Sequence, residues 1–186
     1  PMNRLVQGDV GSGKTMVAAA AAYCAARNGA QTALMAPTEI LAEQHFASLS
    51  ALFVPLGVSV ALLTGSMTGK QKKDVRERIA AGEVQVVIGT HALLSESTRF
   101  EHLGLVITDE QHRFGVGQRS RLSAKGEDPH LLVMSATPIP RTLALILYGD
   151  LDVSILDELP PGREPVDTFL VGESYRPRIN AFIRKQ

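Results

Sequence analysis

The sequence predicts an α/β fold with a mostly parallel central sheet and helices on both of its faces. Short apolar runs alternate with longer helix-like segments along the chain of 186 residues. The runs are continuously apolar, which is typical of strands buried on both faces of a parallel sheet. Strands and helices that alternate at this spacing are typical of doubly wound α/β domains. After a first short strand at 4–7, we expect strands at 32–36, 58–63, 84–88, 105–108 and 131–134.

A glycine-rich loop follows the first expected strand and fits the phosphate-binding pattern G-x-x-x-x-G-K-[ST]. In such loops the backbone N–H groups surround a phosphate chain, the lysine reaches the β- and γ-phosphates, and the hydroxyl can ligate Mg²⁺. The alanine-rich segment 16–26 supplies the helix that must follow, and Asn28-Gly29 is a typical C-cap pair. The residues of the predicted phosphate-binding loop are Gly8, Asp9, Val10, Gly11, Ser12, Gly13, Lys14 and Thr15.

The overall composition restricts the possible partners. Lys+Arg and Asp+Glu both count 19, so the net charge is zero. Any contact with nucleic acid would therefore depend on local patches, backbone amides and hydroxyls. No apolar run is long and charge-free enough to span a bilayer. The lone cysteine, Cys24, is interpreted as a small buried residue and cannot form an internal disulfide. We expect a cytoplasmic protein with no membrane partner.

Small residues and hydroxyls follow the next three expected strands. Thr38 is a predicted N-cap, and Glu39 complements the dipole of the helix that begins there. The same helix N-terminus could receive a backbone phosphate, and both interpretations remain open. His45, further along this helix, is interpreted as exposed. Gly65 and Thr90 follow the third and fourth strands.

The helix after the third strand has a capping box, Thr68 with Gln71, and is expected to end at Ala81-Gly82. Its basic side chains are interspersed with acids, so we interpret them as a solvated face. A nucleic-acid patch is the alternative. The basic residues are Lys70, Lys72, Lys73, Arg76 and Arg78.

The fifth expected strand leads into two acids, Asp109 and Glu110. Behind a phosphate-binding loop, the first carboxylate can hold Mg²⁺ and the second can orient and activate the attacking water. A plain strand-to-loop transition is the alternative. The sixth strand ends in two hydroxyls, which can bond to the side chains that follow the acids and relay the state of the nucleotide. These candidate relay residues are Gln111, His112, Ser135 and Thr137.

The last part of the chain changes in composition. Residues 157–165 contain three prolines and a glycine, and they are predicted to form a linker. We expect residues 1–156 to form the first domain. Residues 166–186, with a strand at 166–171 and a helix at 175–185, would open a truncated second domain. We expect the chain to be a piece of a longer protein.

With these motifs in order, the chain resembles the motor of superfamily 2 helicases, and more closely the RecG family of ATP-dependent DNA helicases. The transcription-repair coupling translocase is a close alternative, but it typically has Glu at the position of Gln111. The resemblance runs through residues 8–15, 36–44, 89–94, 109–116 and 135–143, and its most specific parts are 109–116 and 148–163.

The resemblance implies a RecA-like P-loop NTPase fold and Mg²⁺-dependent ATP hydrolysis coupled to translocation on double-stranded DNA. The expected DNA partners are branched: replication forks and Holliday junctions. The implied roles are phosphate binding for Lys14, magnesium binding for Thr15 and Asp109, and activation of water for Glu110. Gln111, His112, Ser135 and Thr137 become coupling residues, and Thr38, Gly65 and Thr90 become contacts to the DNA backbone.

The resemblance also implies two partners in the same parent chain: a second motor domain with its arginine finger, of which we expect only the first elements here, and a wedge domain that splits the fork. Because an arginine finger contributes orders of magnitude in rate, we expect the fragment alone to be nearly inactive. A nucleotide-gated switch without significant hydrolysis is the competing function class, although Glu110 argues against it. A small-molecule kinase that uses the same loop is a third possibility, but the sequence shows no evident site for a phosphate acceptor.

Overall fold

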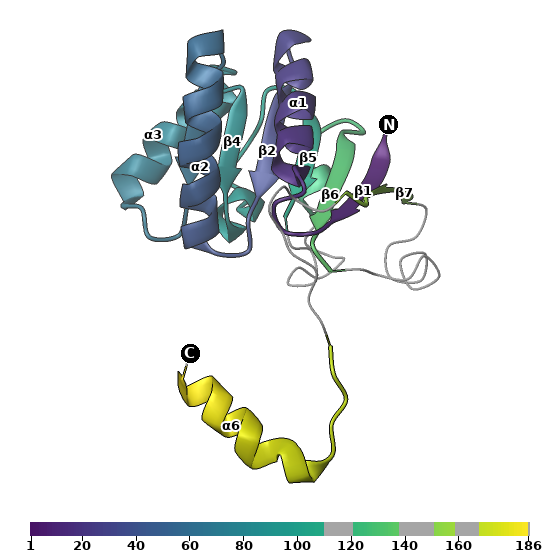
Figure 1. Ribbon diagram of the computed structural model, residues 1–186. Helices are drawn as coiled ribbons and strands as arrows, with labels where there is room; N and C mark the ends of the chain where they lie inside the picture. Colours follow the sequence, from purple (N-terminus) through teal and green to yellow (C-terminus); the bar gives the residue numbers. More distant parts are fainter. Residues whose placement is uncertain (110–120, 138–150, 159–167, 186) are drawn as a thin grey trace.

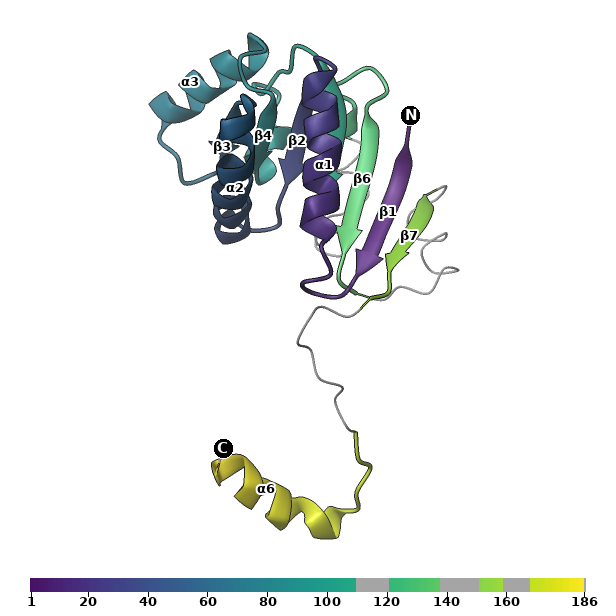
Figure 2. The same ribbon diagram turned by 45° about the horizontal axis from the view of Figure 1, so that its top comes forward.

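A computed structural model describes residues 1–109, 121–137, 151–158 and 168–185 of the chain. Among these residues, seven strands form one sheet in the order β3-β4-β2-β5-β6-β1-β7, and every neighbouring pair is parallel (Figures 1 and 2). This architecture confirms the predicted α/β class. The strands are β1 (Asn3–Gly8), β2 (Gln31–Met35), β3 (Val60–Leu63), β4 (Val86–Gly89), β5 (Leu103–Thr108), β6 (His130–Ser135) and β7 (Asp152–Leu156).

Helices cover both faces of this sheet. In Figure 1, α1 and α2 lie side by side on one face. Small side chains such as Ala18 and Ala22 bring α1 close to buried strand residues such as Ile107. On the other face, Val75 and Ile79 of α3 pack in a second apolar cluster. The helices are α1 (Lys14–Arg27), α2 (Glu39–Phe53), α3 (Gly69–Ala80) and α6 (Arg176–Lys185), with 3-10 turns η1 (Val54–Leu56), η2 (His91–Leu94) and η4 (Glu173–Tyr175).

The helix ends follow the expected local chemistry. Asn28 caps α1, and Gly29 adopts a φ of 75°. The Thr38 hydroxyl accepts a hydrogen bond from the N–H of Leu41 at 3.3 Å and so caps α2. Thr68 and Gln71 form the predicted reciprocal capping box of α3. These three capping predictions are confirmed.

The two outer strands depart from the expectation of strands buried on both faces. In the edge strand β3, Ala61 and Leu63 are buried, while Val60 and Leu62 are partly exposed. The opposite edge is β7, which the sequence analysis did not predict. β7 pairs with β1, and the Arg4 guanidinium bonds to Ser154 at 2.7 Å and to Asp152 at 3.2 Å.

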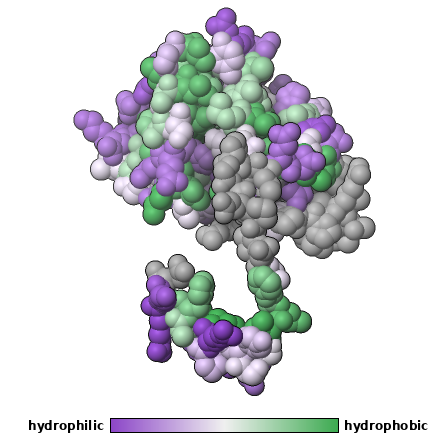
Figure 3. Space-filling view, in the orientation of Figure 1, coloured by the Kyte–Doolittle hydropathy of each residue, from purple (hydrophilic) through white to green (hydrophobic). Residues whose placement is uncertain are grey.

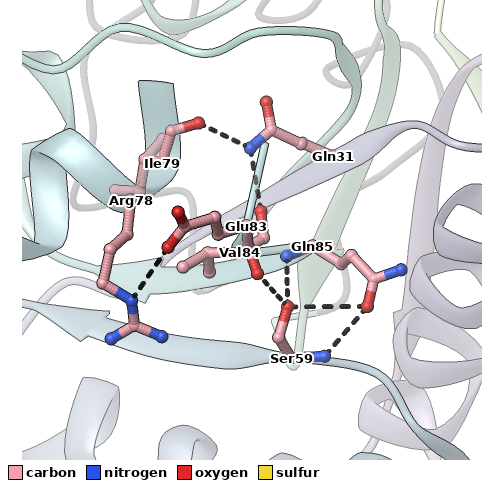
Figure 4. Close-up of polar contacts among 7 residues, drawn as sticks. All are labelled: Gln31, Ser59, Arg78, Ile79, Glu83, Val84 and Gln85. Atoms are coloured by element: carbon pink, nitrogen blue, oxygen red, sulfur yellow. Dashed lines mark hydrogen bonds and ion pairs between the residues drawn. The ribbon is translucent and has the colours of Figure 1, made fainter. Parts of the chain in front are cut away.

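A polar network closes the end of the sheet where β2 begins (Figure 4). The Gln31 side chain is buried, and its amide nitrogen donates to the carbonyl oxygens of Ile79 at 2.9 Å and Val84 at 2.8 Å. Its amide oxygen accepts from the N–H groups of Glu101 at 2.8 Å and His102 at 3.1 Å. This single side chain therefore connects β2 to the end of α3 and to the segments that lead into β4 and β5.

Two further predictions are wrong in the described residues. Residues 168–171 are not in a strand, although the helix after them is present as α6, and every described residue from 168 to 185 is exposed. Figure 3 shows apolar and polar side chains mixed on the surface of this segment. Cys24 is exposed rather than buried, because it lies on the outer side of α1. None of the helices in the described ranges has the length and apolar character needed to cross a membrane.

Candidate functional site

The glycine-rich loop joins the end of β1 to the start of α1. Gly11 and Gly13 have φ values of 85° and 92°, a region that glycine enters without strain. The Lys14 ammonium donates to the carbonyl oxygens of Gly8 and Asp9, both at 2.7 Å. The loop therefore encloses a positive charge that is held by neutral carbonyl groups, beside the positive dipole end of α1.

The surroundings of this loop are tight. A Cβ atom at Gly8 would lie 2.6 Å from the Ser12 hydroxyl oxygen and 2.9 Å from the Cβ of Leu156. The Ser12 hydroxyl is buried without a hydrogen-bond partner among the described residues. A buried hydroxyl without a partner, a lysine ammonium and a helix N-terminus all suit an anion. The residues present therefore fit the phosphate chain of a nucleotide.

The strand order places the acid motif near this loop. β6 lies between β1 and β5, so the ends of these two strands are about 10 Å apart, two strand spacings. Hydroxyl and carboxylate oxygens are ligands that Mg²⁺ accepts, so Thr15 and Asp109 suit a magnesium ion bound with the phosphates. The predicted residues Glu110, Gln111 and His112 lie outside the described residues.

The end of β6 contacts the end of β1. The side-chain amide of Gln7 donates to the carbonyl oxygen of Thr137 at 3.1 Å, and the Ser135 hydroxyl accepts from the N–H of Thr137 at 3.2 Å. Ser135 is buried, whereas Thr137 is exposed. Gln7 was not predicted as a site residue. It connects the strand before the phosphate loop to the segment expected to relay the state of the nucleotide.

His45 is a second residue that sequence reasoning missed. The prediction that it is exposed is wrong, because its imidazole Nε2 lies 2.7 Å from the Asp109 carboxylate and only 12% of its side chain is exposed. The spacing of the helix contains a signal for this position. His45 lies three residues after buried Ala42 and four before buried Leu49, so it belongs to the inward face of α2.

A polar hollow of about 490 Å³ lies beyond the same ends of β2, β3 and β4. It brings together Thr38, Gly65 and Thr90, the three residues predicted to contact a DNA backbone. Two basic side chains of α3, Lys72 and Arg76, also line it. The full lining of the polar hollow is Pro37, Thr38, Glu39, Gly65, Lys72, Arg76, Thr90, His91 and Ala92.

Some basic residues of α3 fit the interpretation as a solvated face, and others fit the alternative of a nucleic-acid patch. Lys70 and Lys73 are exposed, as expected for a solvated face. Lys72 is partly buried in the polar hollow, where its ammonium donates to the carbonyl oxygen of Gly65. Arg76 also lines the hollow and donates to the Thr98 hydroxyl at 3.3 Å.

A single carboxylate, Glu39, lies among the residues that line the polar hollow. Its Oε1 accepts from the N–H of Ser66 at 2.9 Å. Hydrogen bonds from the side chain and backbone of Ser66 hold the pKa of Glu39 below its ordinary value. The carboxylate is therefore ionised at neutral pH and offsets part of the positive charge of Lys72 and Arg76.

Comparisons with known proteins agree with this arrangement. A family model described as DEAD/DEAH box helicase matches residues 2–146. The chain is 58% identical over 185 residues to the ATP-dependent DNA helicase RecG of Bacillus subtilis (strain 168), covering 100% of this chain and 27% of that protein. It is 56% identical over 183 residues to RecG of Escherichia coli (strain K12), covering 96% and 26%.

A solved structure also matches the fold. The structure of RecG bound to a three-way DNA junction superposes with a TM-score of 0.81 at 50% sequence identity, covering 99% of this chain and 25% of that chain. The predicted RecA-like helicase fold is thereby confirmed. The chain spans roughly a quarter of the length of the relatives it matches, as those shares of 25–27% show.

Proposed function

The chain belongs to the DEAD/DEAH box helicase family, and from that membership we propose that it is the ATP-binding first motor domain of a double-stranded DNA translocase. In this proposal the full-length protein remodels replication forks and branch-migrates Holliday junctions in recombination and repair. Identity of 58% to RecG of Bacillus subtilis along the whole chain supports this function. The superposition on RecG bound to a three-way junction supports branched DNA as the substrate.

One observation in particular supports a motor. The phosphate loop with Asp109 and the polar hollow lie at the same edge of one sheet, because both follow the carboxyl ends of parallel strands. A single rigid sheet can therefore hold a nucleotide and a DNA backbone together. α2 begins at the hollow with Thr38 and reaches Asp109 through His45.

The residue roles follow the chemistry of the side chains. Lys14 would bind the β- and γ-phosphates, while Thr15 and Asp109 would hold Mg²⁺, which neutralises the charge that develops during phosphoryl transfer. Glu110 would accept a proton from the attacking water. The loop residues from Gly8 to Thr15 would surround the phosphates. Gln111, His112, Ser135 and Thr137 would couple the state of the nucleotide to movement.

In this proposal the DNA contacts are confined to the polar hollow. Thr38, Gly65 and Thr90 would face the backbone of the duplex, with Lys72 and Arg76 supplying the positive charge. Such contacts position a protein without reading the base sequence. A zero net charge is compatible with this mode, because two basic side chains, Lys72 and Arg76, line the same hollow.

The proposed domain organisation is a first motor domain at 1–156, a linker at 157–165, and the start of a second motor domain at 166–186. The second motor domain and a wedge domain of the same parent chain would be needed for DNA translocation and fork remodelling. A second domain would supply the arginine that stabilises the transition state, so the fragment alone would hydrolyse ATP very slowly. The cytoplasmic location stays a prediction.

The test is Glu110→Gln in the full-length protein. ATP binding should persist, while turnover stimulated by three-way junction DNA should fall at least about 100-fold, the scale of a lost general base. Glu127→Gln, at an exposed acid outside every motif, is the matched control. Normal turnover in Glu110→Gln would refute the assignment. A nucleotide-gated switch instead predicts a slow wild-type rate that junction DNA leaves unchanged.

A further inference from the structure

None of the residue roles proposed above explains what the contact between His45 and Asp109 does. We propose that His45 is a positioning residue that fixes the Asp109 carboxylate for Mg²⁺ and transmits DNA contact at the polar hollow to the ATP site. The inference rests on the proposed motor function, and it names the residue through which the two sites communicate.

We assign the direction of the hydrogen bond from the chemistry of the two groups. An ionised carboxylate can only accept, so His45 Nε2 donates its proton to Asp109 Oδ2 across 2.7 Å. The two side chains are 12% and 14% exposed, so water competes poorly for this bond. A carboxylate has about four lone-pair sites, so one bond to His45 leaves acceptor capacity for the magnesium ion or its water.

The backbone of Asp109 is held separately from its side chain. The N–H of Asp109 donates to the carbonyl oxygen of Met35 at 3.0 Å, which extends the pairing of β5 with β2 by one residue. This bond fixes where the main chain lies. The direction of the carboxylate is then set by the side-chain bond to His45, which comes from a different element, α2.

α2 connects this bond to the polar hollow. Its N-terminal residues Thr38 and Glu39 line the hollow, and His45 lies about 10 Å further along the helix axis. α2 runs without a break from Glu39 to Phe53, so a shift of its first turn would be transmitted along the helix to His45. A DNA backbone that displaces the start of α2 would therefore change the position of His45 relative to Asp109. Contact in the hollow would thereby alter the binding of magnesium and ATP, and by linkage the reverse.

The experiment compares two side chains at position 45 in the full-length protein. His45→Leu fills the same space without a donor, and His45→Gln retains an N–H donor of similar reach. Both are good helix formers, which limits effects on α2. Ser48→Ala, at an exposed position on the same helix, is the matched control. Melting temperature reports whether each variant is folded.

Two readouts separate positioning from simple packing. The first is the affinity of a fluorescent, non-hydrolysable ATP analogue with Mg²⁺ and with EDTA. The second is the ratio of ATPase rates with and without three-way junction DNA. For His45→Leu, affinity in EDTA should stay within about twofold of wild type, while the gain from Mg²⁺ should fall roughly tenfold, the scale of a lost hydrogen bond to a charged group.

The stimulation by junction DNA should fall by a similar factor in His45→Leu and recover in His45→Gln. Unchanged Mg²⁺ gain and unchanged stimulation in His45→Leu would overturn the proposal. Recovery of the melting temperature but of neither readout in His45→Gln would also overturn it, since the contact would then be structural only. Absence of DNA stimulation in the wild-type protein would instead contradict the motor function, while the Mg²⁺ readout would still test the positioning of Asp109.

Discussion

The imidazole Nε2 of His45 and the carboxylate Oδ2 of Asp109 lie 2.7 Å apart, although 64 residues separate them in the chain. They meet because α2 follows β2, Asp109 follows β5, and these two strands are neighbours in the sheet. The candidate magnesium ligand is thereby bonded to the helix that begins at the polar hollow.

The Lys14 ammonium bonds to two backbone carbonyl groups of the glycine-rich loop. Replacing it in Lys14→Met removes an ammonium that bonds to Gly8 and Asp9, and with it the main charge available to a phosphate chain. We expect nucleotide affinity to fall about tenfold to a hundredfold, as for lost charge-assisted hydrogen bonds. Titration with a fluorescent ATP analogue measures this. Lys73→Met, at an exposed lysine of α3, should bind as the wild type does; equal affinity in both variants would contradict the role of Lys14.

Gly89, at the end of β4, permits a close approach of two strands. A Cβ atom at this position would collide with the carbonyl oxygen of Leu63 in β3. Gly89→Ala should therefore reduce the free energy of unfolding by roughly 1–3 kcal/mol, the cost of overpacking. Gly69→Ala is the control, since a Cβ there meets nothing within 4 Å, and it should be neutral or slightly stabilising. Chemical denaturation measures both, and equal stabilities would contradict the steric argument.

Much of the fold follows from local pattern. The strands from β1 to β6, the caps of α1 and α2, and the capping box of α3 lie where apolar runs and capping residues predict them. The order of the strands in the sheet cannot be predicted from local pattern, because it depends on contacts between segments that are distant in sequence. β7 was missed for a related reason: its residues 152–156 contain no long apolar run, and the strand is stabilised by pairing with β1.

Some residues of the candidate site are likewise predictable from local sequence, and others are not. The phosphate loop and Asp109 form contiguous motifs, so the sequence predicts them directly. Gln7 and His45 act through partners 130 and 64 residues away, which no local pattern pairs. The spacing of His45 from Ala42 and Leu49 places it on the inward face of α2, but it does not name Asp109 as the partner.

Gln31 stabilises the sheet at the end opposite the phosphate loop. Its amide makes four hydrogen bonds, with the nitrogen donating twice and the oxygen accepting twice. Gln31→Leu removes the partner of the Val84 carbonyl and of the N–H groups of Glu101 and His102, and each buried unsatisfied group costs about 1–3 kcal/mol. The carbonyl oxygen of Ile79 still accepts from the N–H of Gly82 at 3.1 Å. We expect a drop in melting temperature of several degrees, about 2–4 °C per kcal/mol for a domain of this size. Gln44→Leu, at an exposed position, should shift it little; comparable drops would argue against the network.

Glu39 places a negative charge at the polar hollow, where we propose that a DNA phosphate binds. Its depressed pKa keeps the carboxylate charged at neutral pH, beside Lys72 and Arg76. Glu39→Gln in the full-length protein should raise affinity for duplex DNA roughly twofold to fivefold at low salt, and the gain should shrink as salt increases. Fluorescence anisotropy across a salt series measures this. Glu77→Gln makes the same change in net charge outside the hollow, so an equal gain there would refute a local effect.

The ATPase rate as a function of three-way junction DNA tests the central claim most directly. It should be measured for the full-length protein and for this chain alone. If this chain is only the first of two motor domains, junction DNA should accelerate ATP hydrolysis by the full-length protein. The isolated chain should hydrolyse ATP more slowly by about 10³-fold or more, because it lacks an arginine from the second domain. Hydrolysis by the isolated chain at the rate of the full-length protein would contradict this account, because the catalytic site would then be complete within these 186 residues.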